Sequence, residues 1–151
     1  MSKNESKIVH VHLPVDEPFK TTLTAGRHEI TADEPKDVEG GNNQGPDPYD
    51  LLLMSLGSCT VMTVKMYARR KGYPLKNLYA ELKHHKKHGK DCKHCEDSQS
   101  KIDHIELELI AEGNLSKKQM DKMLSIAQKC PVNRTLTSDI NIEHSIDHRN
   151  T

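Results

Sequence analysis

The sequence predicts an α+β domain, and three observations support this prediction. Segments that alternate apolar and polar residues, as half-buried strands do, occur near the start, in the middle and near the end of the chain. One central segment is almost wholly apolar over the length of a helix, and a later segment repeats its apolar residues at helical spacing. The chain has 151 residues, enough for a core of its own, so we expect a single domain over residues 1–151.

Three short strands are expected in the first part of the chain. Ile8 to Leu13 alternates apolar and polar residues, and Phe19 to Ala25 and His28 to Ala32 form two further extended segments. Gly26 separates the last two and supplies the backbone freedom that a hairpin turn needs. Residues 33–47 are rich in glycine, proline, asparagine and aspartate, which predicts a loop.

A long helix is expected from Pro48 to about Lys71. Asp47 is suited to cap its N-terminus, a proline favours the first helical position, and Asp50 complements the positive end of the helix dipole. The helix is apolar nearly all round, so we expect it to be covered on most sides. Its apolar stretch from Leu51 to Val64 is too short to span a bilayer, which favours a buried helix and no membrane association.

Two longer strands and a second helix follow. The strands are predicted for Leu75 to Lys83 and from Ile102 to Gly113, on either side of a basic, histidine-rich stretch. Ser116 is expected to cap a helix that runs to Cys130. Alternation of apolar and polar residues from Asp139 to Ile146 predicts a last strand.

The overall charge favours neither nucleic acid nor an anionic membrane as a partner. The 22 basic and 22 acidic residues cancel, and a net charge near zero favours self-association. The first seven residues are polar and no apolar segment typical of a signal peptide follows them, so we expect a cytoplasmic protein. In that compartment the four cysteines are expected to be mostly reduced, and no cofactor is predicted.

Two of the cysteines, Cys59 and Cys130, are candidates for redox chemistry. Each shares a helix face with apolar residues, so both are expected to point toward the interior. Free cysteine is often an inert packing residue, and a reactive thiol needs a nearby cation, a helix N-terminus or a metal. On the residues alone, both interpretations stay open, and sequence spacing does not show whether the two thiols meet.

The segment from His84 to Cys95 has a different chemical potential. It contains the motif Cys92-x-x-Cys95 together with several histidines, which are the ligand types that zinc uses. A second Cys-x-x-Cys that would complete a zinc ribbon is missing, and the alternative is a solvated hairpin tip. We therefore assign no metal ligands from the sequence.

Three motifs resemble the OsmC/Ohr family. Gly45 to Thr60 is similar to the signature around the reactive cysteine of that family, and Lys129 to Leu136 to the segment that carries its second cysteine. Thr31 to Pro35, followed by a glycine-rich loop, resembles the branch known as OsmC-like proteins. The resemblance begins near residue 20 and extends to the C-terminus. It implies the OsmC-like fold, an intertwined homodimer in which antiparallel sheets of both chains wrap two central, buried helices.

The resemblance also implies an activity, that of a thiol peroxidase in the oxidative and osmotic stress response. Its substrates would be organic hydroperoxides, with hydrogen peroxide as a further candidate. Cys59 would attack the peroxide and become a sulfenic acid, and Cys130 would convert this acid to a disulfide. A lipoyl-type dithiol or another small thiol would restore both cysteines. The alternative is a stress protein on the same fold that binds zinc or a small molecule without peroxidase turnover.

Two further site residues are carried over from the family. Arg27 is the best match for the arginine that stabilises the reactive thiolate, and Asp50 for the carboxylate that holds this arginine. The Ohr pattern has a glutamate directly after the proline, where this chain has Tyr49, so that Asp50 lies one position later and is one methylene shorter. The alternatives are an exposed turn residue for Arg27 and an acid that complements the helix dipole for Asp50.

Overall fold

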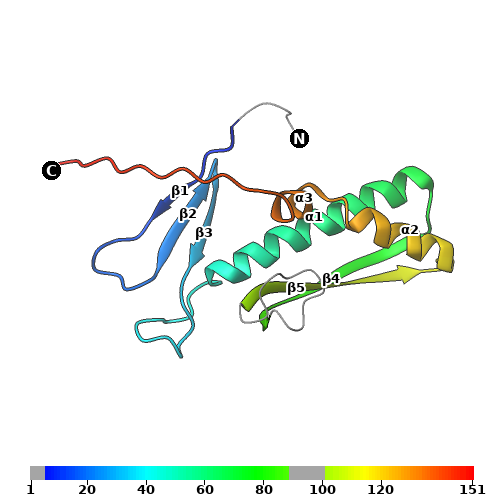
Figure 1. Cartoon of the computed structure of the whole chain (residues 1–151), viewed down its shortest axis with the longest axis horizontal. Coiled ribbons are helices and arrows are strands. Elements are labelled where there is room, and N and C mark those ends of the chain that lie inside the picture. The colour runs from blue at the N-terminus through cyan, green and yellow to red at the C-terminus, as the bar shows by residue number, and fades with distance from the viewer. Residues whose placement is uncertain (1–5, 89–100) are drawn as a thin grey trace. The chain divides into compact units, whose positions relative to one another are not determined.

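The computed structural model describes residues 6–88 and 101–151, and Figure 1 shows the order of their elements. The chain forms two compact units, Met1–Met54 and Ser55–Thr151. The first unit contains a small three-stranded sheet, and the second contains a long two-stranded ribbon with two short helices. A long helix, α1, begins in the first unit and continues in the second. The α+β class expected from the sequence is confirmed.

The N-terminal sheet is antiparallel, in the order β1-β2-β3. Its strands are β1 (His10–His12), β2 (Thr21–Ala25) and β3 (His28–Ala32). Gly26 adopts a φ of 61° in the turn between β2 and β3, a conformation that glycine takes without steric cost. All three predicted strands are confirmed, although the first two are shorter than predicted because only their paired residues form ladder hydrogen bonds.

The loop that follows β3 is organised by one buried carboxylate. Asp33 is only 3% exposed, and its two oxygens accept the backbone N–H groups of three loop residues. The donors are Glu34 at 2.8 Å, Asn42 at 3.3 Å and Gln44 at 3.1 Å. These hydrogen bonds supply the partners that a buried carboxylate requires, so the predicted loop has a defined conformation up to the start of α1.

Helix α1 spans Pro48–Lys71, as predicted. Asp47 and Asp50 form a reciprocal cap at its start. The N–H of Asp50 donates to Oδ1 of Asp47 at 2.8 Å, and the N–H of Asp47 donates to Oδ2 of Asp50 at 3.0 Å. Gly72 follows the last helical residue with a φ of 69°, and its left-handed conformation ends the helix.

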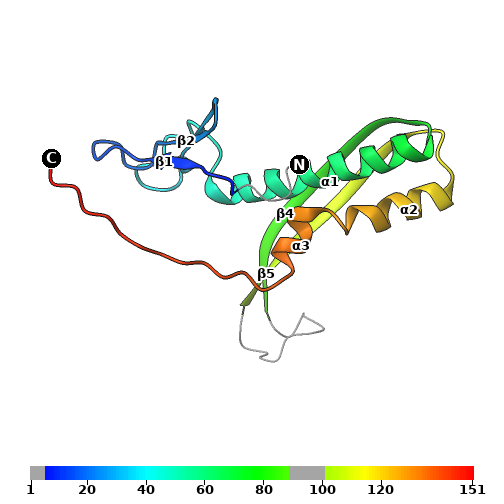
Figure 2. The same ribbon diagram turned by 90° about the horizontal axis from the view of Figure 1, so that it is seen from above.

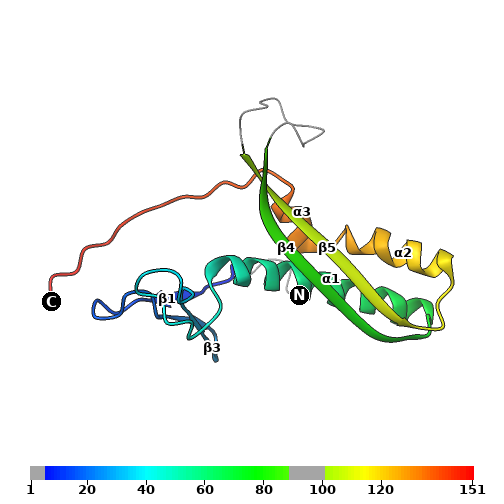
Figure 3. The ribbon, with the colours of Figure 1, turned by 90° about the horizontal axis from the view of Figure 1, so that it is seen from below.

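The second unit is built on an antiparallel ribbon of β4 (Leu75–His88) and β5 (Lys101–Gly113). Helices α1 and α2 (Lys117–Ala127) lie side by side on one face of this ribbon (Figures 1 and 2). Figure 3 shows the opposite face, where no helix of residues 55–88 and 101–151 covers the two strands. Both predicted strands are confirmed, and β4 is five residues longer than the prediction that ended at Lys83.

The core of this unit lies where the two helices meet the ribbon. Val64 and Ala68 of α1 pack against Met123 and Ala127 of α2, and apolar ribbon residues such as Leu78 cover them. Met123 is 1% exposed, and burial of a side chain of this size contributes about 1.5–3 kcal/mol to stability. The packing therefore holds α1, α2 and the ribbon in one fixed arrangement.

Gly57 lets α1 approach the ribbon closely. A Cβ atom at this position would lie 2.7 Å from Cδ1 of Leu82 on β4, closer than two carbon atoms pack. Glycine in a helix interior costs stability relative to alanine. At Gly57 this loss of stability is combined with a close contact between α1 and β4 that a side chain at this position would prevent.

Among the residues whose placement the structure gives, those that cover α1 lie on one of its faces. Its buried residues are Leu56, Gly57, Thr60, Val64 and Ala68. The expectation that the helix is covered on most sides is therefore wrong for the single chain, because the ribbon and α2 both lie on the same side. Among the residues that the structure describes, α1 is also the one helix long and apolar enough to cross a membrane by length and composition. Core helices share these properties, so they do not identify a membrane span.

The predicted second helix ends three residues before Cys130, and a further short helix that was not predicted follows it. α2 ends at Ala127, and the short helix α3 (Pro131–Leu136) begins after Cys130, which caps it. The residue before a proline disfavours the helical conformation, and Cys130 accordingly is extended, with φ −63° and ψ 146°. The prediction of one helix to Cys130 is therefore wrong. The cap expected at Ser116 is confirmed, since its side chain accepts the N–H of Gln119.

The strand predicted for Asp139 to Ile146 does not form in this structure. The segment has no regular secondary structure and no ladder partner among residues 6–88 and 101–151. Its isoleucines Ile140, Ile142 and Ile146 are exposed. The prediction is wrong for the single chain because alternation makes a segment suitable for a strand, whereas a strand forms only when a neighbouring strand accepts its hydrogen bonds.

Candidate functional site

Cys130 carries a fully enclosed thiol in the second unit. Its side chain is 0% exposed, and it lies between α1 and the first turn of α3. The backbone N–H of Asn133 donates to Sγ at 3.3 Å, and the hydroxyl oxygen of Thr60 lies 3.5 Å from the same sulfur. Cys130 therefore contacts the residue that directly follows Cys59 on α1.

Thr60 supports either protonation state of this thiol. Its Oγ1 also lies 2.8 Å from the carbonyl oxygen of Leu56, to which it donates its single proton. In that arrangement the S–H group of Cys130 is the donor to Thr60. A rotation of the hydroxyl would instead direct its proton to a Cys130 thiolate, because a hydroxyl both donates and accepts.

A cavity of about 340 Å³ lies beside this thiol, within the second unit. Thr60 and Asn133, the two hydrogen-bond partners of Cys130, both line it. Most of the remaining wall is apolar, and the polar groups lie toward α3, the end of α2 and the start of β5. The apolar lining residues are Leu56, Ile105, Leu107, Leu124, Ala127 and Leu136. Such a cavity suits a small, mainly apolar ligand.

Cys59 lies on α1 and is partly exposed. Its carbonyl oxygen accepts the hydroxyl of Thr63 at 2.8 Å, an ordinary contact between successive helix turns. Successive helical residues point about 100° apart, so Cys59 emerges beside the face that carries Thr60. Cys59 and Cys130 are both free thiols in this structure.

The other two predicted site residues lie in the N-terminal unit. Arg27 is exposed in the turn between β2 and β3. Asp50 forms the reciprocal cap with Asp47, so its role at the start of the helix, which the sequence suggested as an alternative, is present in the structure. The four residues predicted as one site are thus divided between the two units, and their assembly stays a prediction.

A polar pair lies at the edge of the cavity, on the ribbon. His84 donates from Nε2 to Oδ1 of Asp103 at 2.9 Å, and Nζ of Lys86 lies 3.8 Å from the same oxygen. The hydrogen bond from His84 holds the pKa of the Asp103 carboxyl below its usual range, and the charge of Lys86 acts in the same direction. Because the pKa of Asp103 is lower in the folded protein, its ionised carboxylate stabilises the fold at pH values above the usual carboxyl pKa. This contribution is lost as the pH falls through the lowered pKa.

Sequence reasoning missed several of these residues. Thr60 and Asn133 lie close in sequence to the motif cysteines. They could have been predicted because a hydroxyl group or a backbone N–H near a buried cysteine can form a hydrogen bond with its sulfur. The predicted Cys92-x-x-Cys95 motif lies outside the described residues. His84 and His85 of β4 are described, and His85 lies close to two residues of β5 that the sequence did not single out, His104 and Glu106.

Together, the fold and the site define a small α+β protein with a buried thiol beside an apolar cavity and a second thiol on the adjoining helix. The model of the OsmC-like protein family matches residues 40–145, which include both thiols. The chain belongs to the OsmC-like protein family. This match agrees with the resemblance of the three sequence motifs. It also accounts for α1 as a core helix of this fold.

Solved structures share the fold. An OsmC-like protein from Mycoplasma pneumoniae is 19% identical, with a TM-score of 0.69, and 89% of each chain is covered. An organic hydroperoxide resistance protein OsmC from Legionella pneumophila is 13% identical, with a TM-score of 0.63, over 90% of this chain and 92% of that one. A hypothetical protein from Aquifex aeolicus is 25% identical, with a TM-score of 0.64, over 88% of each chain. The comparison with curated proteins finds no match.

Proposed function

We propose that this protein is a thiol peroxidase that reduces organic hydroperoxides, and also hydrogen peroxide, in the response to oxidative and osmotic stress. The observation that supports it best is the contact of the buried Cys130 thiol with Thr60, the neighbour of Cys59. This contact places one family cysteine against the helix that carries the other. Relatives of the same fold include a protein described as an organic hydroperoxide resistance protein, which supports the same substrate class.

The proposed reaction begins at Cys59. Its thiolate attacks the terminal peroxide oxygen, the O–O bond breaks, and the leaving alkoxide takes up a proton to give an alcohol. Cys59 is then a sulfenic acid. Cys130 attacks this sulfur, a water molecule leaves and a disulfide forms, which a lipoyl-type dithiol or another small thiol reduces by exchange. The complete burial of Cys130 suits the second step, because it keeps bulk peroxide away from this thiol.

Arg27 and Asp50 are proposed to complete the site. An arginine beside Cys59 would favour its thiolate, and a carboxylate would hold the guanidinium in place. The cap at the start of α1 uses Oδ2 of Asp50. A carboxylate has two acceptor oxygens, so capping and binding of an arginine are compatible. We propose the cytoplasm as the protein's compartment, where thiols are kept reduced as this reaction requires.

The test is peroxide consumption by the fully reduced protein in the presence of a dithiol reductant. We expect multiple turnovers with cumene hydroperoxide and slower turnover with hydrogen peroxide, because organic hydroperoxides are the substrate class proposed for this site. The control is the same mixture without protein. A protein that consumes neither peroxide above this background contradicts the peroxidase and leaves binding without turnover as the function of the fold.

We further propose that the protein is a homodimer in which a second copy covers the exposed face of α1. Met62 and Met66 on this face are 63% and 72% exposed in the single chain, an unusual state for neighbouring apolar side chains of a core helix. The C-terminal segment from Asp139 onward carries exposed isoleucines and pairs with no strand in the described part of the chain. Its alternation suits pairing with a sheet edge of the second copy.

Light scattering of the purified protein is expected to give twice the chain mass of 17.1 kDa. The variant Met62→Asp should weaken the dimer at least about tenfold, because association would bury an unpaired charge. Val15→Asp, which adds the same charge to a fully exposed turn residue, is the matched control and should leave the mass unchanged. A wild-type mass of 17.1 kDa at every concentration contradicts the dimer.

A further inference from the structure

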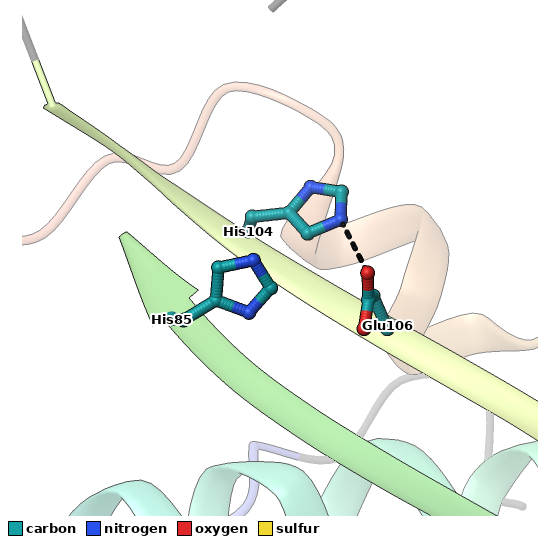
Figure 4. A group of neighbouring side chains, drawn as sticks. All are labelled: His85, His104 and Glu106. Carbon is teal, nitrogen blue, oxygen red and sulfur yellow. Dashed lines mark ion pairs between the residues drawn. The ribbon is translucent and has the colours of Figure 1, made fainter. Parts of the chain in front are cut away.

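Three potential metal ligands meet on the β4–β5 ribbon. They are His85 of β4 and His104 and Glu106 of β5, and one ligand atom of each lies within 4.8 Å of those of the other two (Figure 4). His85 and Glu106 are exposed and His104 is partly buried, so the cluster is accessible to an ion from solution.

The ribbon itself brings these side chains together. His85 and His104 are direct partners in the antiparallel register, and side chains of such partners project from the same face. Their ring centroids are 5.0 Å apart. Glu106 lies two residues after His104, which returns it to the same face of β5. Its Oε1 is 3.5 Å from Nε2 of His104, the ion pair that Figure 4 marks.

This face is opposite to the one that carries the thiol site. Ile105 and Leu107 alternate with His104 and Glu106 along β5 and line the cavity beside Cys130. The three ligand candidates therefore project away from α1 and α2, on the side of the ribbon that Figure 3 shows free of helices. An ion bound there would not contact the reacting sulfur atoms through the cavity.

We propose that His85, His104 and Glu106 bind one divalent transition-metal ion, with Zn²⁺ as the best fit. Two imidazoles and one carboxylate form a ligand set that zinc accepts with a fourth position open to water. Mg²⁺ and Ca²⁺ prefer oxygen ligands throughout, so a site with two imidazoles does not favour them. This inference is independent of the peroxidase and of its thiols.

The geometry is close to that of a bound site. With bonds of about 2.0–2.1 Å, the donors of a tetrahedral zinc site lie about 3.3 Å apart. The present spread of up to 4.8 Å closes to this value by rotation of the three side chains, without movement of the strands.

The experiment is a titration of the full-length protein with Zn²⁺, and with Co²⁺ as a spectroscopic probe. Cys92 and Cys95 are potential zinc ligands in their own right, so the titration uses the background Cys92→Ser/Cys95→Ser. We expect one ion to bind per chain in this background, with a Co²⁺ spectrum that lacks the charge-transfer absorption of a thiolate ligand.

Substitution of a ligand decides the assignment. His104→Gln is expected to weaken Zn²⁺ binding at least about tenfold, and Glu106→Gln is a second, independent variant with an effect in the same direction. His28→Gln is the matched control, because it removes an exposed histidine from β3 and should leave the affinity unchanged. Circular dichroism of each variant without metal checks that the ribbon still folds.

Two results would overturn the proposal. One is the absence of Zn²⁺ binding in the Cys92→Ser/Cys95→Ser background, which would assign any metal affinity of the natural chain to its cysteines. The other is binding that His104→Gln and Glu106→Gln reduce no more than His28→Gln does. Because these readouts measure metal affinity and not peroxide turnover, they are independent of the outcome for the peroxidase.

Discussion

Cys59→Ser is expected to abolish peroxide turnover. The hydroxyl of serine is a far weaker nucleophile toward peroxide oxygen than a thiolate, and it forms no sulfenic acid. We expect the rate with cumene hydroperoxide to fall at least about a hundredfold, to the level of the reductant alone. The change replaces one sulfur atom by oxygen at a partly exposed position of α1, so the fold should be unaffected.

The matched control for Cys59→Ser is the double variant Cys92→Ser/Cys95→Ser. It removes two thiols of the same chain by the same chemical change and is expected to retain the wild-type rate. Circular dichroism and light scattering of each variant separate lost chemistry from lost structure. Full turnover by Cys59→Ser would show that the proposed nucleophile is wrong.

Cys130→Ser is expected to stop the reaction after its first step. Cys59 would still reduce one equivalent of peroxide, but its sulfenic acid would have no internal thiol to condense with. We expect steady-state turnover to fall at least about tenfold. A probe that reacts with sulfenic acids should label Cys59 in this variant, and excess peroxide should oxidise it further to the sulfinic acid.

The structure makes this variant informative. Cys130 caps α3 by accepting the N–H of Asn133, and serine is one of the preferred residues at such a position. A serine hydroxyl can also replace the thiol in the contact with Thr60, so α3 and its packing should be retained. The control is Cys59→Ser, which the probe should not label. Undiminished turnover by Cys130→Ser would rule out Cys130 as the resolving thiol, and an external thiol would have to take its place.

Local signals explain why the helices and most strands could be predicted. The cap of Asp47, the glycine at position 72 and the apolar residues between them define α1 within one stretch of chain. Alternation identified β4 and β5 because one face of each strand packs on helices and the other does not. Each of these signals acts over neighbouring residues, so it is present in the sequence itself.

Most of the predictions that were wrong concern features that depend on a partner segment, which the local sequence pattern does not identify. The Asp139 to Ile146 segment alternates like a strand, yet no strand within residues 6–88 and 101–151 pairs with it. The end of α2 was misplaced because Pro131 acts on Cys130 before it and so starts a new helix. Coverage of α1 was overestimated because the apolar pattern does not show whether the covering surface belongs to the same chain.

For the two candidate sites as well, some features follow from the sequence and others only from the tertiary structure. The sequence by itself determined the secondary structure around Cys59 and the family to which the chain belongs, because caps, apolar spacing and motifs are local. The tertiary structure alone decided that Cys130 contacts Thr60, 70 positions away, and that His85 meets His104 and Glu106. The packing of α1 on the ribbon and the register of β4 with β5 create these contacts. Both join segments far apart in the chain, which no local pattern records.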